Sequence, residues 1–127
     1  MEWAVEPDSK AGERRYVAVP DELVEAFLAT LDVPFGSFAL DPYRDYTFQP
    51  SQVATALARA EQAIDEMRSA HREAALKKLR LREWQPWAEG LLGSLESEDP
   101  LLGVLQAFRK LCELSLHSNR PMEMYGQ

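Results

Sequence analysis

The sequence lacks the residues on which several kinds of function depend. Cys112 is the only cysteine among 127 residues, so the chain forms neither an internal disulfide nor a zinc site built from several thiolates. We therefore expect a reducing compartment. No uninterrupted apolar stretch approaches the roughly 20 residues that cross a bilayer, and no basic leader precedes an apolar segment at the N-terminus. These absences predict a cytoplasmic protein with no membrane partner.

Positive charge is scarce in the first half of the chain. Residues 1–66 carry 13 acidic and five basic side chains, a net charge of −8, whereas residues 67–127 carry eight acidic and nine basic ones, a net charge of +1. An acidic surface repels phosphate backbones and attracts basic proteins. The charge therefore disfavours nucleic acid and favours a basic protein as the partner, although a net charge of −7 is also ordinary in a soluble domain.

Residues 50–85 contain no glycine, and their only proline is the first residue, Pro50. We expect a long helix to begin there, because apolar positions recur at alternating intervals of four and three residues, which is one face of a helix. After Ala74 this spacing would continue at Lys78, which is charged, so we expect a bend or a break between Ala74 and Arg82. The predicted buried positions are Val53, Leu57, Ala60, Ile64, Met67, His71 and Ala74.

Strand patterns lie at both ends of the chain. Residues 1–19 read as a hairpin, with turn residues at 7–12 between two short strands, and Met122–Tyr125 alternates apolar and charged side chains. Three shorter helices are expected at Asp21–Leu31, Pro86–Leu95 and Pro100–His117. The sequence therefore predicts a single α+β domain over residues 1–127, mostly helical, with about four helices around one long central helix and a small antiparallel sheet near the termini.

Residues 32–49 contain prolines and a glycine that exclude a helix, together with a group of aromatic side chains. We interpret this segment as a loop or short strand that covers the core, because aromatic side chains are normally buried. The alternative is a cage for a ligand. The rings belong to Phe35, Phe38, Tyr43, Tyr46 and Phe48.

No set of residues predicts a catalytic centre, a metal site or a bound cofactor. His71 lies on the apolar face of the long helix and His117 ends the last helix, and neither has an evident partner. No pair of histidines has the helical spacing that metal sites use. Cys112 lies on an apolar helix, where a cysteine behaves as a small hydrophobic residue. We interpret the cations between Arg68 and Arg82 as one polar helix face, not as a surface for lipid or nucleic acid.

Asp41 and Asp45 lie four residues apart in the aromatic segment. We interpret them as structural residues that cap turns and accept backbone hydrogen bonds near the start of the long helix. The alternative is a small-ligand or metal-binding enzyme in which the two carboxylates hold a divalent ion or transfer protons.

Two segments resemble a group of small stand-alone bacterial proteins. The first is residues 41–52, with the sequence DPYRDYTFQPSQ, which leads into Leu57 and Ile64, and the second is the C-terminal MEMYGQ. In those proteins an aspartate-tyrosine-aspartate loop opens a long helix and a short aromatic-glycine strand ends the chain. Some of them are proposed immunity partners of polymorphic toxins. The resemblance implies a protein that binds another protein, such as a basic toxin domain, and that has no catalytic residues.

Together these patterns favour a non-catalytic protein-binding function of the inhibitor or immunity type. The expected partner-binding residues are the carboxylates of the first helix and of the aromatic segment. A third alternative is a structural subunit that associates with itself, as a homodimer for example, through the long helix. The expected contact residues are Asp21, Glu22, Glu25, Asp41 and Asp45.

Overall fold

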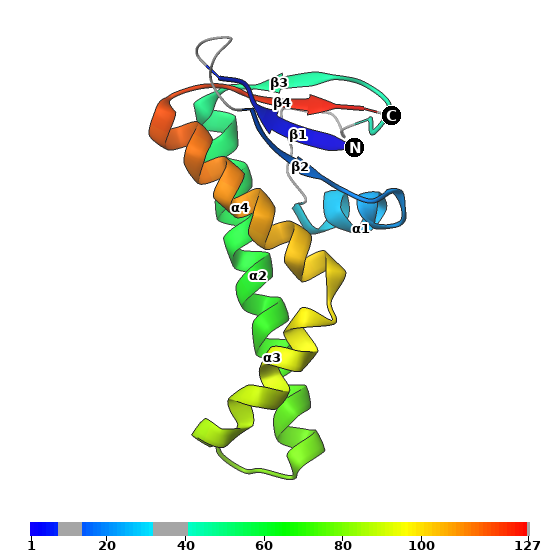
Figure 1. Ribbon diagram of the computed structural model, residues 1–127, viewed down its shortest axis with the longest axis vertical. Helices are drawn as coiled ribbons and strands as arrows, with labels where there is room; N and C mark the ends of the chain where they lie inside the picture. Colours follow the sequence, from blue (N-terminus) through cyan, green and yellow to red (C-terminus); the bar gives the residue numbers. More distant parts are fainter. Residues whose placement is uncertain (8–13, 32–40, 127) are drawn as a thin grey trace.

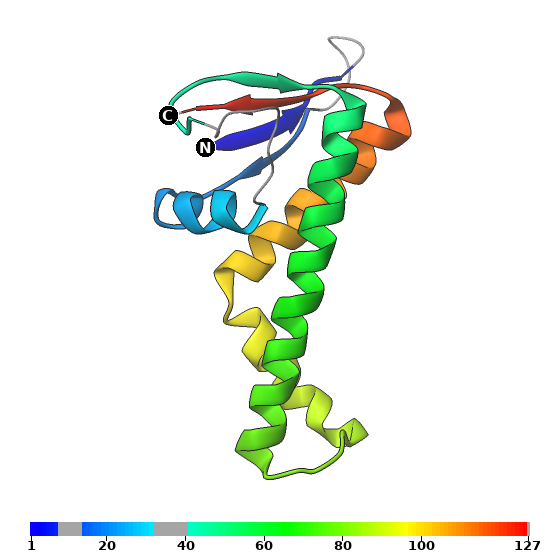
Figure 2. The same cartoon turned by 180° about the vertical axis from the view of Figure 1, so that it is seen from behind.

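The computed structural model describes residues 1–7, 14–31 and 41–126. Figures 1 and 2 show an elongated molecule with a head, made of the sheet and α1, and an arm, made of the second half of α2 together with η1 and α3. The helices are α1 (Asp21–Leu31), α2 (Pro50–Leu79), the 3-10 turn η1 (Pro86–Ala88), α3 (Glu89–Ser97) and α4 (Pro100–Ser118). The strands are β1 (Glu2–Val5), β2 (Arg15–Ala18), β3 (Tyr46–Phe48) and β4 (Met122–Tyr125). The prediction of a mostly helical α+β fold is confirmed.

The sheet has the strand order β2-β1-β4-β3, and all neighbouring strands are antiparallel. β1 is paired on both sides, because Glu2 lies opposite Ala18 of β2 and also opposite Tyr125 of β4. These pairings confirm both the N-terminal hairpin and the strand near the C-terminus. Most of the expected turn, residues 8–12, lies outside the described residues.

The aromatic segment is only partly buried. Phe48 of β3 is 3% exposed and pairs with Met122 of β4, which agrees with a short strand that covers the core. Tyr43, by contrast, is 72% exposed, so the prediction that this ring covers the core is wrong. Its neighbours form a turn that projects from the sheet, which leaves the ring in solvent. Phe35 and Phe38 lie outside the described residues.

The core is built around the indole ring of Trp3, which is fully buried. This ring stacks on Phe48 of β3 with centroids 5.3 Å apart, and it meets Phe27 of α1 and Phe108 of α4 edge-on at 6.0 and 5.0 Å. Phe27 and Phe108 also contact each other at 5.2 Å. One strand residue therefore joins the sheet to two of the helices that cover one of its faces (Figure 1).

Helix α2 begins and ends close to the predicted positions. At its start the Gln49 amide donates to the side chain of Gln52 over 2.9 Å, which forms a capping box. It ends at Leu79, where Arg80 adopts the left-handed conformation with φ of 55°. The predicted break between Ala74 and Arg82 is therefore confirmed. No helix in the described ranges is both long enough and apolar enough to cross a bilayer.

The predicted buried face of α2 is largely correct up to Met67, although Leu57 and Met67 are only partly buried, and it is wrong near the end of the helix. Ala74 is exposed and Ala75 is buried instead, while His71 is only partly buried. The face shifts where α3 and η1 take the place of α4 as the elements that pack on α2 (Figures 1 and 2). Alanines on α2 allow this close approach. The buried residues are Val53, Ala56, Ala60, Ala63, Ile64 and Ala75.

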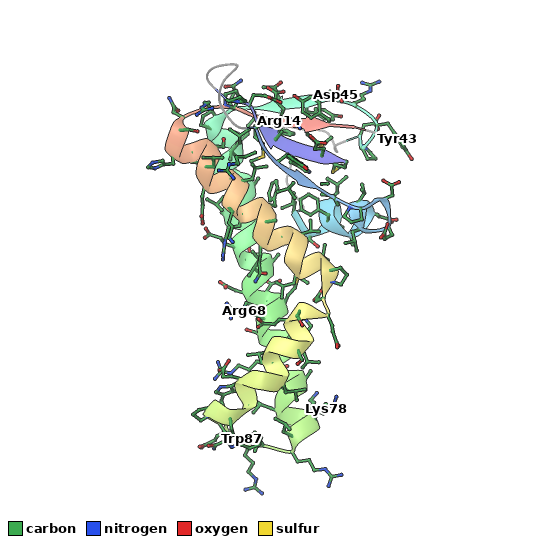
Figure 3. All side chains as sticks on the ribbon, viewed as in Figure 1. Arg14, Tyr43, Asp45, Arg68, Lys78 and Trp87 are labelled. Carbon is green, nitrogen blue, oxygen red and sulfur yellow. The ribbon has the colours of Figure 1, made fainter. Side chains whose placement is uncertain are left out.

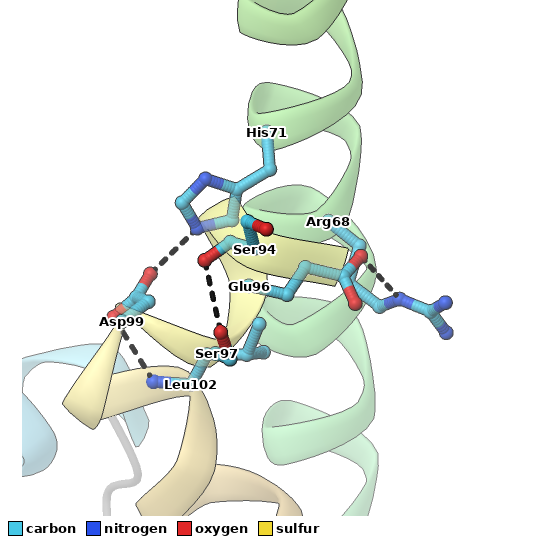
Figure 4. Close-up of polar contacts among 7 residues, drawn as sticks. All are labelled: Arg68, His71, Ser94, Glu96, Ser97, Asp99 and Leu102. Carbon is cyan, nitrogen blue, oxygen red and sulfur yellow. Dashed lines mark hydrogen bonds and ion pairs between the residues drawn. The ribbon is translucent and has the colours of Figure 1, made fainter. Parts of the chain in front are cut away.

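A polar contact connects α2 to the beginning of α4 (Figure 4). The Asp99 carboxylate accepts a hydrogen bond from the Leu102 amide over 3.2 Å, as an N-cap does, and its other oxygen lies 2.7 Å from Nε2 of His71. The interpretation that His71 has no evident partner is therefore wrong, because Asp99 lies 28 residues away and no local pattern links the two.

Phe108→Ala should lower the free energy of unfolding by about 3–5 kcal/mol, because it removes a ring that contacts two others in a fully buried site. Urea unfolding of the purified protein measures this loss. Tyr43→Ala is the control, since it removes a similar ring from an exposed position and should change stability by less than about 1 kcal/mol. Equal losses in both variants would show that Phe108 is not central.

Asp99→Ala should lower the free energy of unfolding by about 1–3 kcal/mol, because it removes the cap of α4 and the contact with His71 together. Glu98→Ala, at the exposed preceding residue, is the matched control and should have little effect. Thermal unfolding followed by circular dichroism compares the two. If Glu98→Ala were as harmful as Asp99→Ala, the contacts of Asp99 would not account for the loss.

Candidate functional site

A groove in the head lies between α1 and the segment 41–45. Helix α1 contributes Asp21, Val24, Glu25 and Leu28, whose intervals of three and four residues place them on one face. Pro42 and Tyr43 of the segment line the other side, and the groove encloses about 400 Å³. We call this the acidic groove. Its lining combines two carboxylates with an apolar floor and an exposed aromatic ring.

Backbone hydrogen bonds fix the wall formed by residues 41–45. The Asp41 carboxylate accepts from the Tyr43 amide over 2.9 Å, and the Asp41 carbonyl accepts from the Arg44 amide over 3.2 Å, which makes a tight turn. The Asp41 amide in turn donates to the Tyr46 hydroxyl over 3.0 Å. The turn therefore presents Tyr43 to the groove from a fixed backbone.

The C-terminal segment supports the same wall from outside. The Gly126 amide donates to the Asp45 carboxylate over 2.9 Å. A Cβ atom at residue 126 would lie only 2.5 Å from the backbone of Tyr43 and Arg44, so only glycine fits this close contact. The position of the wall thus depends on the end of β4.

The structure separates the predicted contact residues into two groups. Asp21 and Glu25 line the groove, and Glu22 is exposed on the same helix, one residue away from the groove face. Asp41 and Asp45 instead accept backbone hydrogen bonds that hold the wall, in keeping with their interpretation as structural residues. Sequence reasoning missed Val24, Leu28 and Pro42 as lining residues. The spacing of Val24 and Leu28 along α1 places them on the same face as Asp21 and Glu25, but no pattern within α1 indicates that the segment with Pro42 lies beside that face.

The groove has the chemistry to hold a lysine or arginine side chain. The apolar floor can contact the aliphatic stem of such a side chain, while the carboxylates pair with its charged end. The Tyr43 ring adds a face on which a cation binds favourably. The first turn of α1 contains two acidic residues, Asp21 and Glu22.

The groups that resemble catalytic or metal-binding residues are engaged in structure. Within residues 1–7, 14–31 and 41–126, no three histidine, cysteine, aspartate or glutamate side chains are placed to hold a metal ion. Burial raises the pKa of the Cys112 thiol, which disfavours the nucleophilic thiolate. The pair of His71 and Asp99 caps a helix, and no hydrogen bond joins it to a hydroxyl or thiol among the described residues.

A second polar cluster lies at the edge of the sheet around Arg14. Its guanidinium pairs with Glu2 and Glu6 and lies 5.6 and 5.4 Å from the ring centres of Tyr16 and Tyr125. Hydrogen bonds from Arg14 and Tyr125 lower the pKa of the Glu6 carboxyl, and the bond to Glu6 raises the pKa of Tyr125. These mutual contacts link β1 and β4 to the beginning of β2, so the cluster has a structural role.

Asp45→Ala should lower the free energy of unfolding by about 0.5–1.5 kcal/mol, because it removes the acceptor of the Gly126 amide. Arg44→Ala, at the exposed neighbouring residue, is the control and should have a smaller effect. Denaturant unfolding measures both. Calorimetry with calcium and magnesium ions then tests the enzyme-like alternative: tight binding by the wild type that Asp45→Ala abolishes would assign the carboxylate to a metal site.

The chain was compared with protein-family models, with curated proteins and with solved structures. None of these comparisons finds a match. A proposal for the function of the protein therefore rests on its sequence and its structure.

Proposed function

We propose that the protein is a non-catalytic binding protein of the inhibitor or immunity type, which works in the cytoplasm and docks a basic protein partner. The observation that carries this proposal is the acidic groove, where Asp21 and Glu25 stand above an apolar floor beside the exposed ring of Tyr43. A toxin domain with a basic surface is the kind of partner that fits the resemblance in the sequence.

The groove would serve as the anchor of a larger interface. Stable protein–protein contacts bury about 800 Å² on each partner, more than one groove supplies, and a few anchoring side chains give most of the binding energy. A lysine or arginine of the partner would be such an anchor. Glu22, exposed outside the groove, would act at longer range by attracting the partner during encounter.

The proposal is preferred over an enzyme because of where the candidate groups lie. The carboxylates of Asp41 and Asp45 accept hydrogen bonds from backbone amides, and the Cys112 thiol is buried. Asp21 and Glu25 sit beside Val24 and Leu28, and no histidine, cysteine or serine is among the described residues that line the groove. Such a lining supports recognition better than acid–base or nucleophilic chemistry.

Charge reversal on α1 tests this function. The wild type, immobilised, should capture a basic protein from the source cell or the product of an adjacent gene. Glu22→Lys/Glu25→Lys should then slow association at low salt by about tenfold or more and weaken its salt dependence, because such charges act through the encounter rate. Surface plasmon resonance at two salt concentrations measures both effects.

The matched control is Glu61→Lys/Asp65→Lys, which makes the same change in net charge on exposed residues of α2. It should reduce the association rate much less. Tyr43→Ala should instead speed dissociation, because it removes a ring that lines the groove. If no partner is captured, or if its association responds equally to both charge reversals, the proposed function is wrong.

A further inference from the structure

The end of the arm carries a group of cations that the fold does not neutralise. We call residues 77–87 the tip; it includes the last turn of α2 and the connection to η1. All four basic side chains of the tip are exposed, and within the described residues none of them forms an ion pair. The indole of Trp87 beside them is 64% exposed. The four are Lys77, Lys78, Arg80 and Arg82.

The neighbouring charges on the arm behave differently. Arg68 pairs with Glu96 over 3.1 Å, and the Arg72 guanidinium lies 4.5 Å from the centre of the Trp84 ring. The Trp84 indole donates to Glu89 over 3.0 Å. These contacts bind α2 to α3 and occupy two of the nearby carboxylates. Glu83 is the one acidic residue within the tip, so the tip keeps an excess of positive charge.

Arg80 occupies a backbone position that favours glycine. Its φ of 55° is left-handed, and a helix that ends in this way usually has glycine there. An arginine at such a position adds a cation to the tip at some conformational cost. This is consistent with a use for the positive charge at the end of the arm.

The tip and the acidic groove lie at opposite ends of the molecule. Figure 3 shows Tyr43 in the head and Lys78 and Trp87 at the far end of the arm. Helix α2, with 30 residues, spans about 45 Å between them. Charges are screened over about 8 Å at physiological salt, so the two ends do not cancel each other's field. The tip of a molecule also cannot reach its own groove.

We propose that the tip of one molecule docks into the acidic groove of a second copy, head to tail. This inference rests on the proposed function, because it uses the groove as a receptor for basic side chains. The groove offers the exposed carboxylate of Glu25 to a cation and apolar side chains to its stem, and the tip offers exposed lysine and arginine side chains. The tip would therefore occupy the surface that the basic partner needs.

Such a contact is heterologous, since the two surfaces that meet are different. Each added molecule leaves one groove and one tip unoccupied, so association continues with concentration unless a ring closes. The tip suits this role better than it suits single-stranded nucleic acid. Binding of single strands uses successive exposed rings, whereas Arg72 already covers the ring of Trp84.

Sedimentation velocity of the purified protein tests the inference without any partner. The wild type should gain mass between micromolar and millimolar concentration at low salt and lose that gain at 0.5 M salt. Two charge-reversed variants, Glu22→Lys/Glu25→Lys in the head and Lys78→Glu/Arg82→Glu in the tip, should each stay monomeric at the same concentrations. Circular dichroism should show that both are folded.

Mixing the two variants is the decisive measurement. The mixture pairs the basic head of one variant with the acidic tip of the other, and the unchanged head with the unchanged tip, so association should return. The control Glu61→Lys/Asp65→Lys should associate like the wild type. A wild type that stays monomeric at millimolar concentration, or a mixture that stays monomeric, would overturn the inference.

The same measurement separates this inference from the proposed function. A monomeric wild type that still captures a basic partner through α1 would overturn the second-copy contact alone. Self-association without any captured partner would leave the contact standing and remove the inhibitor function. Binding of the tip to single-stranded RNA or to phosphatidylglycerol vesicles by a monomeric wild type, lost in Lys78→Glu/Arg82→Glu, would assign the tip to a different partner and also overturn the inference.

Discussion

The contact between the indole of Trp3 and three phenylalanine rings is the constraint on which the rest of the molecule depends. Phe27 fixes the rotation of α1, and Phe48 fixes β3, from which the segment 41–45 projects. Helix α1 and the segment 41–45 are the opposite walls of the acidic groove. A strand residue that contributes nothing to the groove lining therefore determines the distance between its walls. The acidic groove and the core therefore cannot vary independently.

The helices and strands were predicted well because the residues that mark their ends lie within a few positions of those ends. Asp99 and Pro100 mark the start of α4, and Asn119, left-handed with φ of 53°, marks its end. The last helix accordingly runs to Ser118, one residue beyond the predicted end. The break after α2 was also predictable, because the apolar spacing fails near Lys78. Helix propensity and capping depend on residues within about one turn of each other, so they can be recognised from the sequence alone.

The parts that could not be predicted are contacts between distant residues. Ala75 is buried and Ala74 is exposed in the part of α2 on which α3 and η1 pack, and no spacing within α2 reveals that packing. The pairing of His71 with Asp99 joins residues from two helices. The acidic groove has the same origin, since the carboxylates of α1 could be named from the sequence but the turn around Tyr43 could not be placed beside them.

The distribution of charge shows why composition is a weak guide to surface electrostatics. The second half of the chain is close to neutral, yet its arginines differ in environment. Arg68 and Arg72 are engaged along the arm, and the tip retains its cations. In the head, likewise, the carboxylate of Glu6 is held by Arg14, whereas that of Glu25 is exposed beside the apolar residues of the groove. Pairing within the fold, and not the number of charges alone, therefore decides the electrostatic character of each end of the molecule.

The pairing of β1 with β4 has a consequence for the order of folding. Glu2 and Tyr125 are neighbours in the sheet although almost the whole chain separates them, so this pairing requires the closure of a very large loop. The antiparallel helices of the arm, by contrast, are joined by a short connection and can assemble early. Because Gly126 follows β4 and supports the wall of the groove, that wall is complete only after this distant contact has formed. A chain in which β1 and β4 have not yet paired therefore lacks the finished wall of this groove.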